Sequence, residues 1–369
     1  MKILQISMGN QFGGVEILEL NLAKNSNKSF KFDLLVPDKS IPKDYIDLME
    51  NLGCRIYNMN ISRNNIKGKI AFAIRLYKFL KNNKYDVIHI HSSAFFFSFH
   101  VALIARWCKN KKIIAHIHST PKVKLIKRII KHMLFPVYLK IVDEYLACSK
   151  KAGEEYFTKK YMDRVKILKN GIEIEKFKFD ENVRKEYREE LKLGDSIVYG
   201  NTSRFEIEKN YMFLIDIFNE IQKKQKNSKL LLVGDGSLKK EIEKRIEKLG
   251  ISDKVILLGF RQDINKILNC MDIFILPSIR EGLGISAIEA QANGLYTYCS
   301  KAIPNEAKIS SKFEYFDLKD SPLSIAERMY NTKMDIEYRK KAYFNAIKNG
   351  YDIIQVCKEL EAIYENMNM

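Results

Sequence analysis

Residues 273–299 read IFILPSIREGLGISAIEAQANGLYTYC, and this stretch decides the fold of the second half of the chain. An apolar strand is expected at Ile273–Leu276, a helix at Ser286–Ala292 and a second strand at Tyr296–Cys299. Continuous apolar runs of this kind are typical of strands that helices cover on both faces. A strand, a helix and a strand in so short a span predict two parallel strands of one sheet.

The same alternation runs through the whole chain. In the second half, strands are also expected at Ile197–Gly200, Leu230–Val233 and Val255–Leu258, with helices at Tyr211–Lys224, Leu238–Leu249 and Ile264–Cys270. In the first half, strands are expected at Ile3–Ser7, Phe32–Val36, Val87–His91, Ile113–His118, Tyr145–Ala147 and Val165–Leu168, with helices such as Val15–Lys24 and Ile70–Lys81. The sequence therefore predicts an α/β protein with two Rossmann-like, doubly wound parallel-sheet domains.

A strong turn signal, Asn170-Gly171, ends the first series of strands. We expect an N-terminal domain at residues 1–172 and a C-terminal domain at residues 173–351. The remaining segment, 352–369, has one apolar stripe on a predicted helix, which must pack on another surface. The N-terminal domain is the candidate for that surface.

Composition excludes several classes of protein. No run of about 18 apolar residues is present, so no spanning helix is expected, and the start MKILQISMGN turns polar too early for a signal peptide. The six cysteines are scattered without metal-ligand spacing, which favours a reducing cytoplasm over a disulfide framework or a zinc site. A net charge of +18 fits a nucleic acid, an anionic membrane or a phosphorylated substrate, but also a simple Lys-rich composition.

The loop from Ser278 into the helix at 286–292 has the features of a phosphate site. Gly282 and Gly284 allow a ligand to approach the backbone closely, and the first amides of a helix attract phosphate. The flanking carboxylates of Glu281 and Glu289 suit sugar or ribose hydroxyl groups. A tight turn before a solvated helix would explain the same residues without a ligand.

Two cations, Arg204 and Lys209, follow the first strand of the second half. Loops at the carboxyl ends of parallel strands share one edge of the sheet, so both cations could face the same phosphate groups. In a Lys-rich chain, an ordinary exposed basic pair is the alternative.

These segments together resemble the retaining glycosyltransferases of family 4, which have the GT-B fold, and particularly bacterial capsule and exopolysaccharide sugar transferases. Glu281 and Glu289 match the E-x7-E motif of that family, and Arg204 and Lys209 match its R-x4-K pair. Other matching segments are Gly234-Asp235-Gly236-Ser237-Leu238, Gly259-Phe260-Arg261, Gly294-Leu295, Ala147-Cys148-Ser149 and Asn170-Gly171-Ile172. The resemblance covers most of the chain.

The resemblance implies two domains that face a cleft, with the acceptor on the first and a nucleotide-sugar donor, expected to be UDP-linked, on the second. Arg204 and Lys209 would bind the diphosphate, Glu289 the ribose and Glu281 the donor sugar. The donor site as a whole would include Gly13, Gly14, Arg204, Lys209, Gly234, Phe260, Arg261, Glu281, Gly282, Leu283, Gly284, Ile285, Ser286 and Glu289. Apart from the donor, no cofactor and no metal is expected.

A histidine at the end of a strand, His118, resembles the one that family members place beside the transferred sugar. Together with Arg204, Lys209 and Glu281 it completes the candidate catalytic set. His116 lies on the same face of its strand by period-two alternation, and His89 and His91 form a similar pair one strand earlier. A structural role is the alternative for all four histidines.

The sequence departs from the family pattern at four positions. Ser203 stands where the family usually has glycine, and Gly284 where it often has proline. Tyr296 and Tyr298 replace the usual proline and small residue. Ser203 could crowd the diphosphate, so the choice of donor stays open.

Residues 121–140 combine basic and apolar residues without an acidic one, a pattern that suits an anionic membrane surface and a lipid-linked acceptor. A solvated helix face is the alternative. We therefore expect a cytoplasmic enzyme, peripheral at the inner face of the cell membrane. Competing functions are a nucleotide-sugar epimerase or phosphorylase of the same architecture. A nucleic-acid binder ranks lower because no recognisable motif for one is present.

Overall fold

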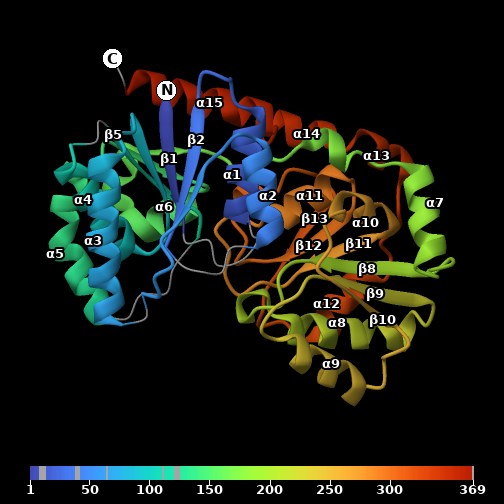
Figure 1. Ribbon diagram of the computed structural model, residues 1–369. Coiled ribbons are helices and arrows are strands. Elements are labelled where there is room, and N and C mark those ends of the chain that lie inside the picture. The colour runs from blue at the N-terminus through green and yellow to red at the C-terminus, as the bar shows by residue number, and fades with distance from the viewer. Residues whose placement is uncertain (8–13, 38–41, 64, 110–111, 120–124, 368–369) are drawn as a thin grey trace. The chain divides into compact units, whose positions relative to one another are not determined.

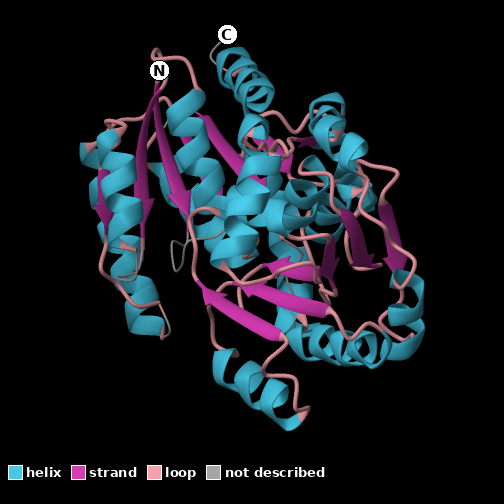
Figure 2. Cartoon of the chain, turned by 90° about the vertical axis from the view of Figure 1, so that its right-hand side faces the viewer, coloured by secondary structure: helices cyan, strands magenta, loops and turns pink. Residues whose placement is uncertain are grey.

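The computed structural model describes residues 1–7, 14–37, 42–63, 65–109, 112–119 and 125–367 of the chain. These residues form two compact units, which are drawn in Figure 1 and, after a quarter turn, in Figure 2. Unit 1 consists of Met1–Ile172 and Asp352–Met369, and unit 2 consists of Glu173–Tyr351.

Unit 1 is built on a parallel sheet of seven strands in the order β3-β2-β1-β4-β5-β6-β7. The strands are β1 Lys2–Ser7, β2 Lys31–Val36, β3 Ile56–Asn58, β4 Val87–His91, β5 Lys112–Ile117, β6 Glu144–Ala147 and β7 Val165–Ile167. The helices are α1 Gly14–Asn25, α2 Lys43–Asn51, α3 Ile66–Asn82, α4 Phe95–Trp107, α5 Leu125–Ile141, α6 Lys150–Phe157 and α15 Ile353–Asn366.

Helices cover both faces of this sheet (Figures 1 and 2). Alternate strand residues such as Ile88 and Ile90 pack with α3, α4 and α5 in one core. Their neighbour Val87 faces the second core, which contains α1, α2 and α15. The C-terminal helix α15 buries Ile353, Val356, Cys357, Leu360 and Tyr364 in this second core.

Unit 2 is built on a parallel sheet of six strands in the order β10-β9-β8-β11-β12-β13. The strands are β8 Ile197–Thr202, β9 Ser228–Val233, β10 Val255–Gly259, β11 Ile273–Leu276, β12 Tyr296–Ser300 and β13 Phe313–Phe316. The helices are α7 Glu181–Glu190, α8 Tyr211–Lys224, α9 Lys239–Lys248, α10 Ile264–Cys270, α11 Ile285–Ala292, α12 Pro322–Met329, α13 Ile336–Lys341 and α14 Tyr343–Lys348. The predicted α/β class with two doubly wound parallel sheets is confirmed.

The tyrosines that depart from the family pattern are accommodated in strand β12. The Tyr298 side chain is buried in the core with α8 and α12, and its hydroxyl donates to the Arg328 carbonyl at 3.0 Å. Tyr296 stacks on it with ring centroids 5.0 Å apart. Tyr296 begins the strand, so its position is at the amino end of β12.

Candidate functional site

The strand order of unit 2 reverses between β8 and β11, because β9 and β10 lie on one side of β8 and β11 to β13 on the other. In open parallel sheets, ligands bind at the carboxyl ends of the strands at such a switch point. The loops that leave β8 and β11 contact each other there. The Ile279 amide donates to the Glu208 carbonyl at 2.8 Å, and the Arg280 guanidinium donates to the Glu208 carboxylate at 3.2 Å.

The same two loops bring Lys209 and Glu281 together. The Lys209 ammonium forms an ion pair with the Glu281 carboxylate, which also accepts a 3.0 Å hydrogen bond from the Ser278 hydroxyl. The two side chains are 19% and 12% exposed, so the pair is shielded but still reachable from solvent. The Glu281 carboxylate holds the Lys209 ammonium in position at this edge of the sheet and compensates part of its charge.

Helix α11 begins at this edge. Gly284 precedes it with φ 88° and ψ 55°, a left-handed conformation that glycine adopts without strain. A Cβ at this position would come within 3.3 Å of the Ile303 side chain. The amides of Ile285 and Ser286 open the helix and have no intrahelical partner. The departure from proline at 284 therefore matches the positive φ, which proline cannot adopt.

One turn further along α11 lies Glu289. Its carboxylate has no hydrogen-bond or ion-pair partner among the residues that the structure describes. Part of the side chain remains accessible to solvent, but desolvation of the carboxyl group by the protein around it raises the pKa of Glu289 to about 8. A carboxyl group with unused acceptor capacity at this edge suits a ligand with hydroxyl groups.

The turn after β9 supports the loop after β8. The Phe205 amide donates to the Asp235 carbonyl at 2.9 Å, and the Leu238 amide donates to the Phe205 carbonyl at 2.9 Å. A Cβ on Gly234 would lie 2.2 Å from the Ser203 carbonyl oxygen, and one on Gly236 would lie 2.6 Å from the Phe205 carbonyl oxygen. The two glycines are therefore required by the close approach of these loops.

Ser203, the residue expected to crowd a diphosphate, is part of a hydrogen-bond network. Its hydroxyl donates to the Asn201 side-chain oxygen at 2.5 Å and lies 3.0 Å from the Tyr211 hydroxyl. Asn201 in turn donates to the Ile275 carbonyl at 2.6 Å, which connects β8 to β11. The serine hydroxyl thus stabilises the base of the loop that carries Arg204, which is itself exposed.

Phe260 and Arg261 follow β10 at the same edge of the sheet. The Phe260 side chain is 54% exposed. The Arg261 guanidinium donates to both oxygens of Asp263, at 2.8 Å and 2.6 Å, and this pairing lowers the pKa of Asp263 to about 2. The charge of Arg261 is thereby neutralised locally, so the exposed ring is the better candidate for contact with a base.

In unit 1, four imidazoles form an array: His89 and His91 lie on β4, His116 lies on β5, and His118 follows directly after β5. Nδ1 of His91 lies 2.9 Å from Nε2 of His118, and Nε2 of His89 lies 3.3 Å from Nδ1 of His116. Burial lowers the pKa of all four rings, to about 4 for His118 and about 3 for His89. The imidazoles are therefore neutral at pH 7 and can exchange hydrogen bonds without carrying charge.

Ligand atoms of His89, His91 and His116 lie within 4.8 Å of one another, a spacing that a metal site would need. However, Nδ1 of His89 is 2.7 Å from the Tyr364 hydroxyl and its Nε2 faces His116. Both ring nitrogens of His89 thus already have hydrogen-bond partners, which favours a hydrogen-bonded array over a metal centre. Gly14 begins α1, and Gly13 lies outside the described residues.

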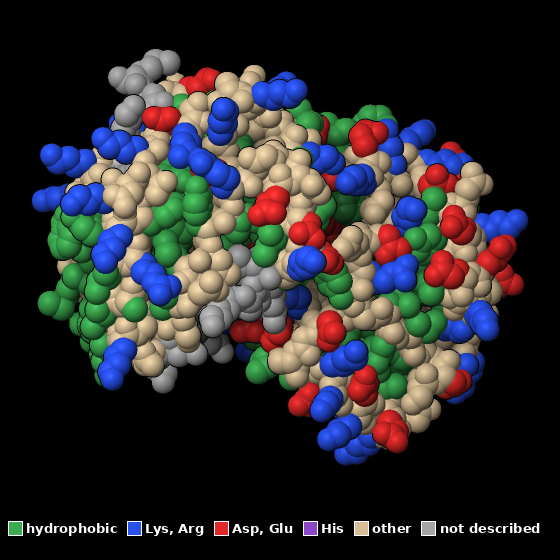
Figure 3. All heavy atoms as spheres, in the orientation of Figure 1, with side chains coloured by type: hydrophobic (Ala, Val, Ile, Leu, Met, Phe, Trp, Pro, Cys, Tyr) green, Lys and Arg blue, Asp and Glu red, His purple; other side chains and the backbone are tan. Residues whose placement is uncertain are grey.

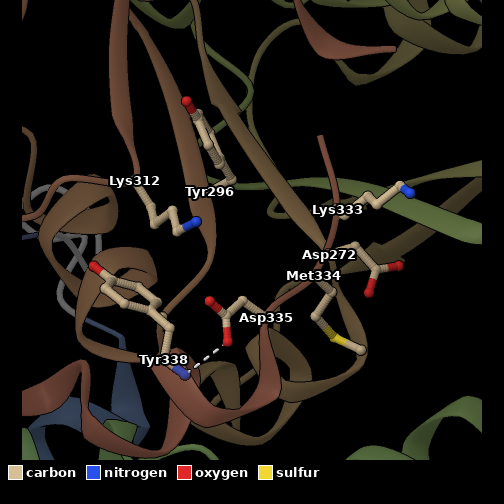
Figure 4. A pocket seen from close by; sticks show the side chains of 8 residues that line it. Asp272, Tyr296, Lys312, Lys333, Met334, Asp335 and Tyr338 are labelled. Atoms are coloured by element: carbon tan, nitrogen blue, oxygen red, sulfur yellow. Dashed lines mark hydrogen bonds between the residues drawn. The ribbon is translucent and has the colours of Figure 1, made fainter. Parts of the chain in front are cut away.

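Unit 2 also has a small depression that is separate from the candidate site (Figure 4). Asp272, Tyr296, Lys312, Lys333, Met334, Asp335 and Tyr338 line it. Asp272 precedes β11 and Tyr296 begins β12, so the depression is at the amino ends of the strands. This is the edge opposite to Lys209 and Glu281, and it does not contribute to the candidate site.

Sequence reasoning missed the residues that join the loops. Glu208 bridges to Ile279 and Arg280, and Asn201 bridges β8 to β11. A polar residue at the end of an otherwise apolar strand is the only local signal for Asn201. Glu208 gives none, because its partners are 71 and 72 positions away in the chain.

Comparisons with known proteins identify the class to which this fold and site belong. A family model described as Glycosyl transferases group 1 matches residues 183–348, and one described as Glycosyltransferase Family 4 matches residues 12–176. The first match lies in unit 2, and the second extends over most of unit 1 and four residues into unit 2. The protein is a glycosyltransferase. More specifically, it belongs to the family 4 glycosyltransferases with the two-domain GT-B fold.

Individual relatives agree with this assignment. The chain is 27% identical to a putative glycosyltransferase, EpsF of Bacillus subtilis, over 82% of this chain and 79% of the relative. It is 26% identical to an Escherichia coli UDP-Gal:alpha-D-GlcNAc-diphosphoundecaprenol alpha-1,3-galactosyltransferase, over 100% of this chain and 97% of that enzyme. Among solved structures, Anabaena HepE in complex with UDP and glucose has a TM-score of 0.80 at 18% identity, covering 99% of this chain and 100% of HepE.

Proposed function

We propose that this glycosyltransferase moves a sugar from a UDP-sugar to a lipid-linked or glycan acceptor in bacterial surface-polysaccharide synthesis. The donor occupies the carboxyl edge of unit 2, and the acceptor is bound by unit 1. The observation that carries the proposal is the meeting of the Lys209 and Glu281 loops at the switch point between β8 and β11. The E. coli relative uses a UDP-sugar and a diphosphoundecaprenol acceptor according to its name, which supports both halves of the proposal.

The side chains of the proposed site contact different parts of the donor. Arg204, Lys209 and the first amides of α11 bind the diphosphate, and they stabilise the negative charge that develops as UDP leaves. Glu289 accepts hydrogen bonds from the ribose, and Glu281 orients hydroxyl groups of the sugar. Phe260 packs near the base, and His118, as a neutral imidazole, hydrogen-bonds the transferred sugar.

We further propose that the transfer retains the anomeric configuration of the donor and requires no metal ion. Two cations and a helix N-terminus supply the charge that a divalent ion would otherwise provide. We also propose that the enzyme acts in the cytoplasm, bound peripherally to the membrane. Among the described residues, no helix combines the length and the apolar character that crossing a bilayer requires.

The test is a transfer assay of the full chain with a set of UDP- and GDP-sugars and a polyprenyl-diphosphate sugar acceptor, with and without EDTA. We expect a UDP-sugar to react, the rate to be unchanged by EDTA, and the new linkage to show the anomeric configuration of the donor by NMR. Inversion at the anomeric carbon would refute the retaining mechanism. Donor consumption without any acceptor would instead indicate a nucleotide-sugar epimerase or phosphorylase.

A further inference from the structure

Helix α3 has an apolar stripe that no described residue covers. Ile66, Ile70, Ile74 and Tyr77 are 74%, 54%, 51% and 41% exposed. Their spacing of four, four and three residues places them on one face of the helix. A different face of the helix already supplies Phe72, Leu76 and Leu80 to the core of unit 1. The exposed stripe is therefore not needed for folding.

Helix α5 shows the same feature more strongly. Its inner face buries Lys131, Phe135 and Tyr138. Six large apolar side chains point outward, each between 41% and 73% exposed: Leu125, Ile126, Ile129, Ile130, Met133 and Val137. A surface helix normally has the reverse arrangement, with apolar residues inward and charged residues outward.

The two stripes belong to one side of unit 1. Helix α4 packs between α3 and α5 and ends at Trp107, the only tryptophan of the chain, which is 69% exposed. Eleven of the 24 exposed large hydrophobic side chains among the described residues lie on these three helices. Figure 3 shows hydrophobic side chains gathered over α3 and α5, bordered by basic ones. Apolar surface on this scale marks a site of interaction.

The charge of this side is equally distinctive. Helices α3, α4 and α5 contain no acidic residue, although the chain has 45 of them. Eight basic side chains of α3 and α5 are exposed: Lys67, Lys69, Arg75, Lys78, Lys81, Lys127, Arg128 and Lys140. Helix α9 in unit 2, by contrast, alternates both signs. A Lys-rich composition explains the basic residues, but it does not explain the missing acids.

We propose that the α3–α4–α5 surface docks on an anionic lipid bilayer. The aliphatic side chains enter the boundary between headgroups and acyl chains, and the basic residues neutralise lipid phosphates. Trp107 lies at the depth where tryptophan concentrates in membrane proteins. A second copy of the chain is a poor occupant, because two surfaces of this charge repel each other. Lysine is also depleted in protein interfaces. This docking extends beyond the catalytic proposal and does not depend on which donor the enzyme uses.

The single tryptophan provides a direct readout of docking. The full chain is mixed with vesicles of neutral phosphatidylcholine or with vesicles that also contain phosphatidylglycerol. Tryptophan emission and co-sedimentation are then measured. We expect a blue shift and sedimentation with the anionic vesicles only, both reduced by salt. Equal behaviour with neutral vesicles, or no response to either, overturns the proposal. A lipid-free oligomer that buries Trp107 would assign the surface to a second copy and would equally overturn it.

Matched variants separate the apolar and basic contributions. Ile126→Ser/Ile129→Ser/Met133→Ser should weaken vesicle binding by about 100-fold or more, because three aliphatic side chains no longer enter the bilayer. Lys127→Ala/Arg128→Ala should weaken it about 25-fold, at about fivefold per basic residue. The control Leu323→Ser/Ile336→Ser, at two exposed positions of unit 2, should leave vesicle binding unchanged. Thermal unfolding of each variant confirms folding; normal vesicle binding by the folded triple variant would refute the proposal.

Discussion

The ion pair between Lys209 and Glu281 permits a test that separates a structural from a functional role. Replacing Lys209 with methionine keeps an unbranched side chain that is one atom shorter and removes its charge. Among the described residues, the Glu281 carboxylate, 12% exposed, then retains only the Ser278 hydroxyl at 3.0 Å as a hydrogen-bond partner. Loss of a hydrogen bond to a charged group costs about 1.5–3 kcal/mol. The Lys209→Met variant should therefore unfold at lower urea concentration than the wild type.

The second change, Glu281→Gln, distinguishes the two roles. In the double variant no charge is left unpaired, so most of the lost stability should return. Turnover should not return, because the phosphate groups still lack their cation. A unit charge at about 4 Å with an effective dielectric of about 20 contributes about 4 kcal/mol, and loss of one such contact typically lowers rates by about 10²–10³-fold. We expect a loss of that size in Lys209→Met and in the double variant.

Urea unfolding and UDP release from the preferred UDP-sugar are the two assays. A matched control is the pair formed by Arg245 and Asp216 between α9 and α8, whose side chains are 33% and 29% exposed. Arg245→Met should lower stability slightly and leave turnover unchanged. The reasoning is refuted if the folded double variant turns over at the wild-type rate, since the pair would then be purely structural.

Three further predictions concern stability and pH. Gly294→Ala should lower the free energy of unfolding by about 1–3 kcal/mol more than Gly250→Ala. Both glycines have positive φ, but only at 294 would the new Cβ clash, because it would lie 2.6 Å from the Arg339 Cα. Equal urea midpoints of the two variants would contradict this. Burial raises the pKa of Glu19 to about 8, so the folded state retains a proton that the unfolded state releases near 4.5, and stability falls by up to about 1.4 kcal/mol per pH unit between those values. Glu19→Gln should flatten that dependence in unfolding measured from pH 5 to 8; an unchanged slope would show that the carboxyl is already ionised. Because the pKa of His118 is about 4, the transfer rate should show no step near pH 6.5 from this group, while His118→Ala should lower it by about 10²-fold; a step that disappears in this variant would show that the imidazole titrates there.

The sequence was most informative about the parallel sheets, where continuous apolar runs and helical periods are strong signals. Helices α8 and α10 begin and end as predicted from the sequence. The edge strands β3, Ile56–Asn58, and β13, Phe313–Phe316, were missed because short, partly exposed strands carry little pattern. Helix α7 was not predicted, because with Tyr187 as its one buried residue it has little apolar pattern.

The candidate site was less predictable, since its geometry depends on contacts between distant loops. Lys209 and Glu281 could be nominated from their motifs, but their ion pair appears only when β8 and β11 are neighbours. From the sequence, Ser203 was expected to crowd the diphosphate. In the structure its hydroxyl forms hydrogen bonds with Asn201 and Tyr211. Residues 121–140 were expected to suit a membrane surface, but the sequence could not show which side chains of α5 are exposed, because periodicity alone does not show which stripe faces the core.

The central claim is that unit 2 binds a nucleoside diphosphate through the loops after β8 and β11. Calorimetric titration of UDP into the full chain and into Arg204→Ala/Lys209→Ala measures this without any assumption about the acceptor. We predict one UDP bound per wild-type chain and an affinity reduced by about 100-fold or more in the double variant, which thermal unfolding first shows to be folded at the temperature of the titration. Unchanged affinity in the double variant, or no affinity of the wild type for UDP or any other nucleoside diphosphate, would contradict the account.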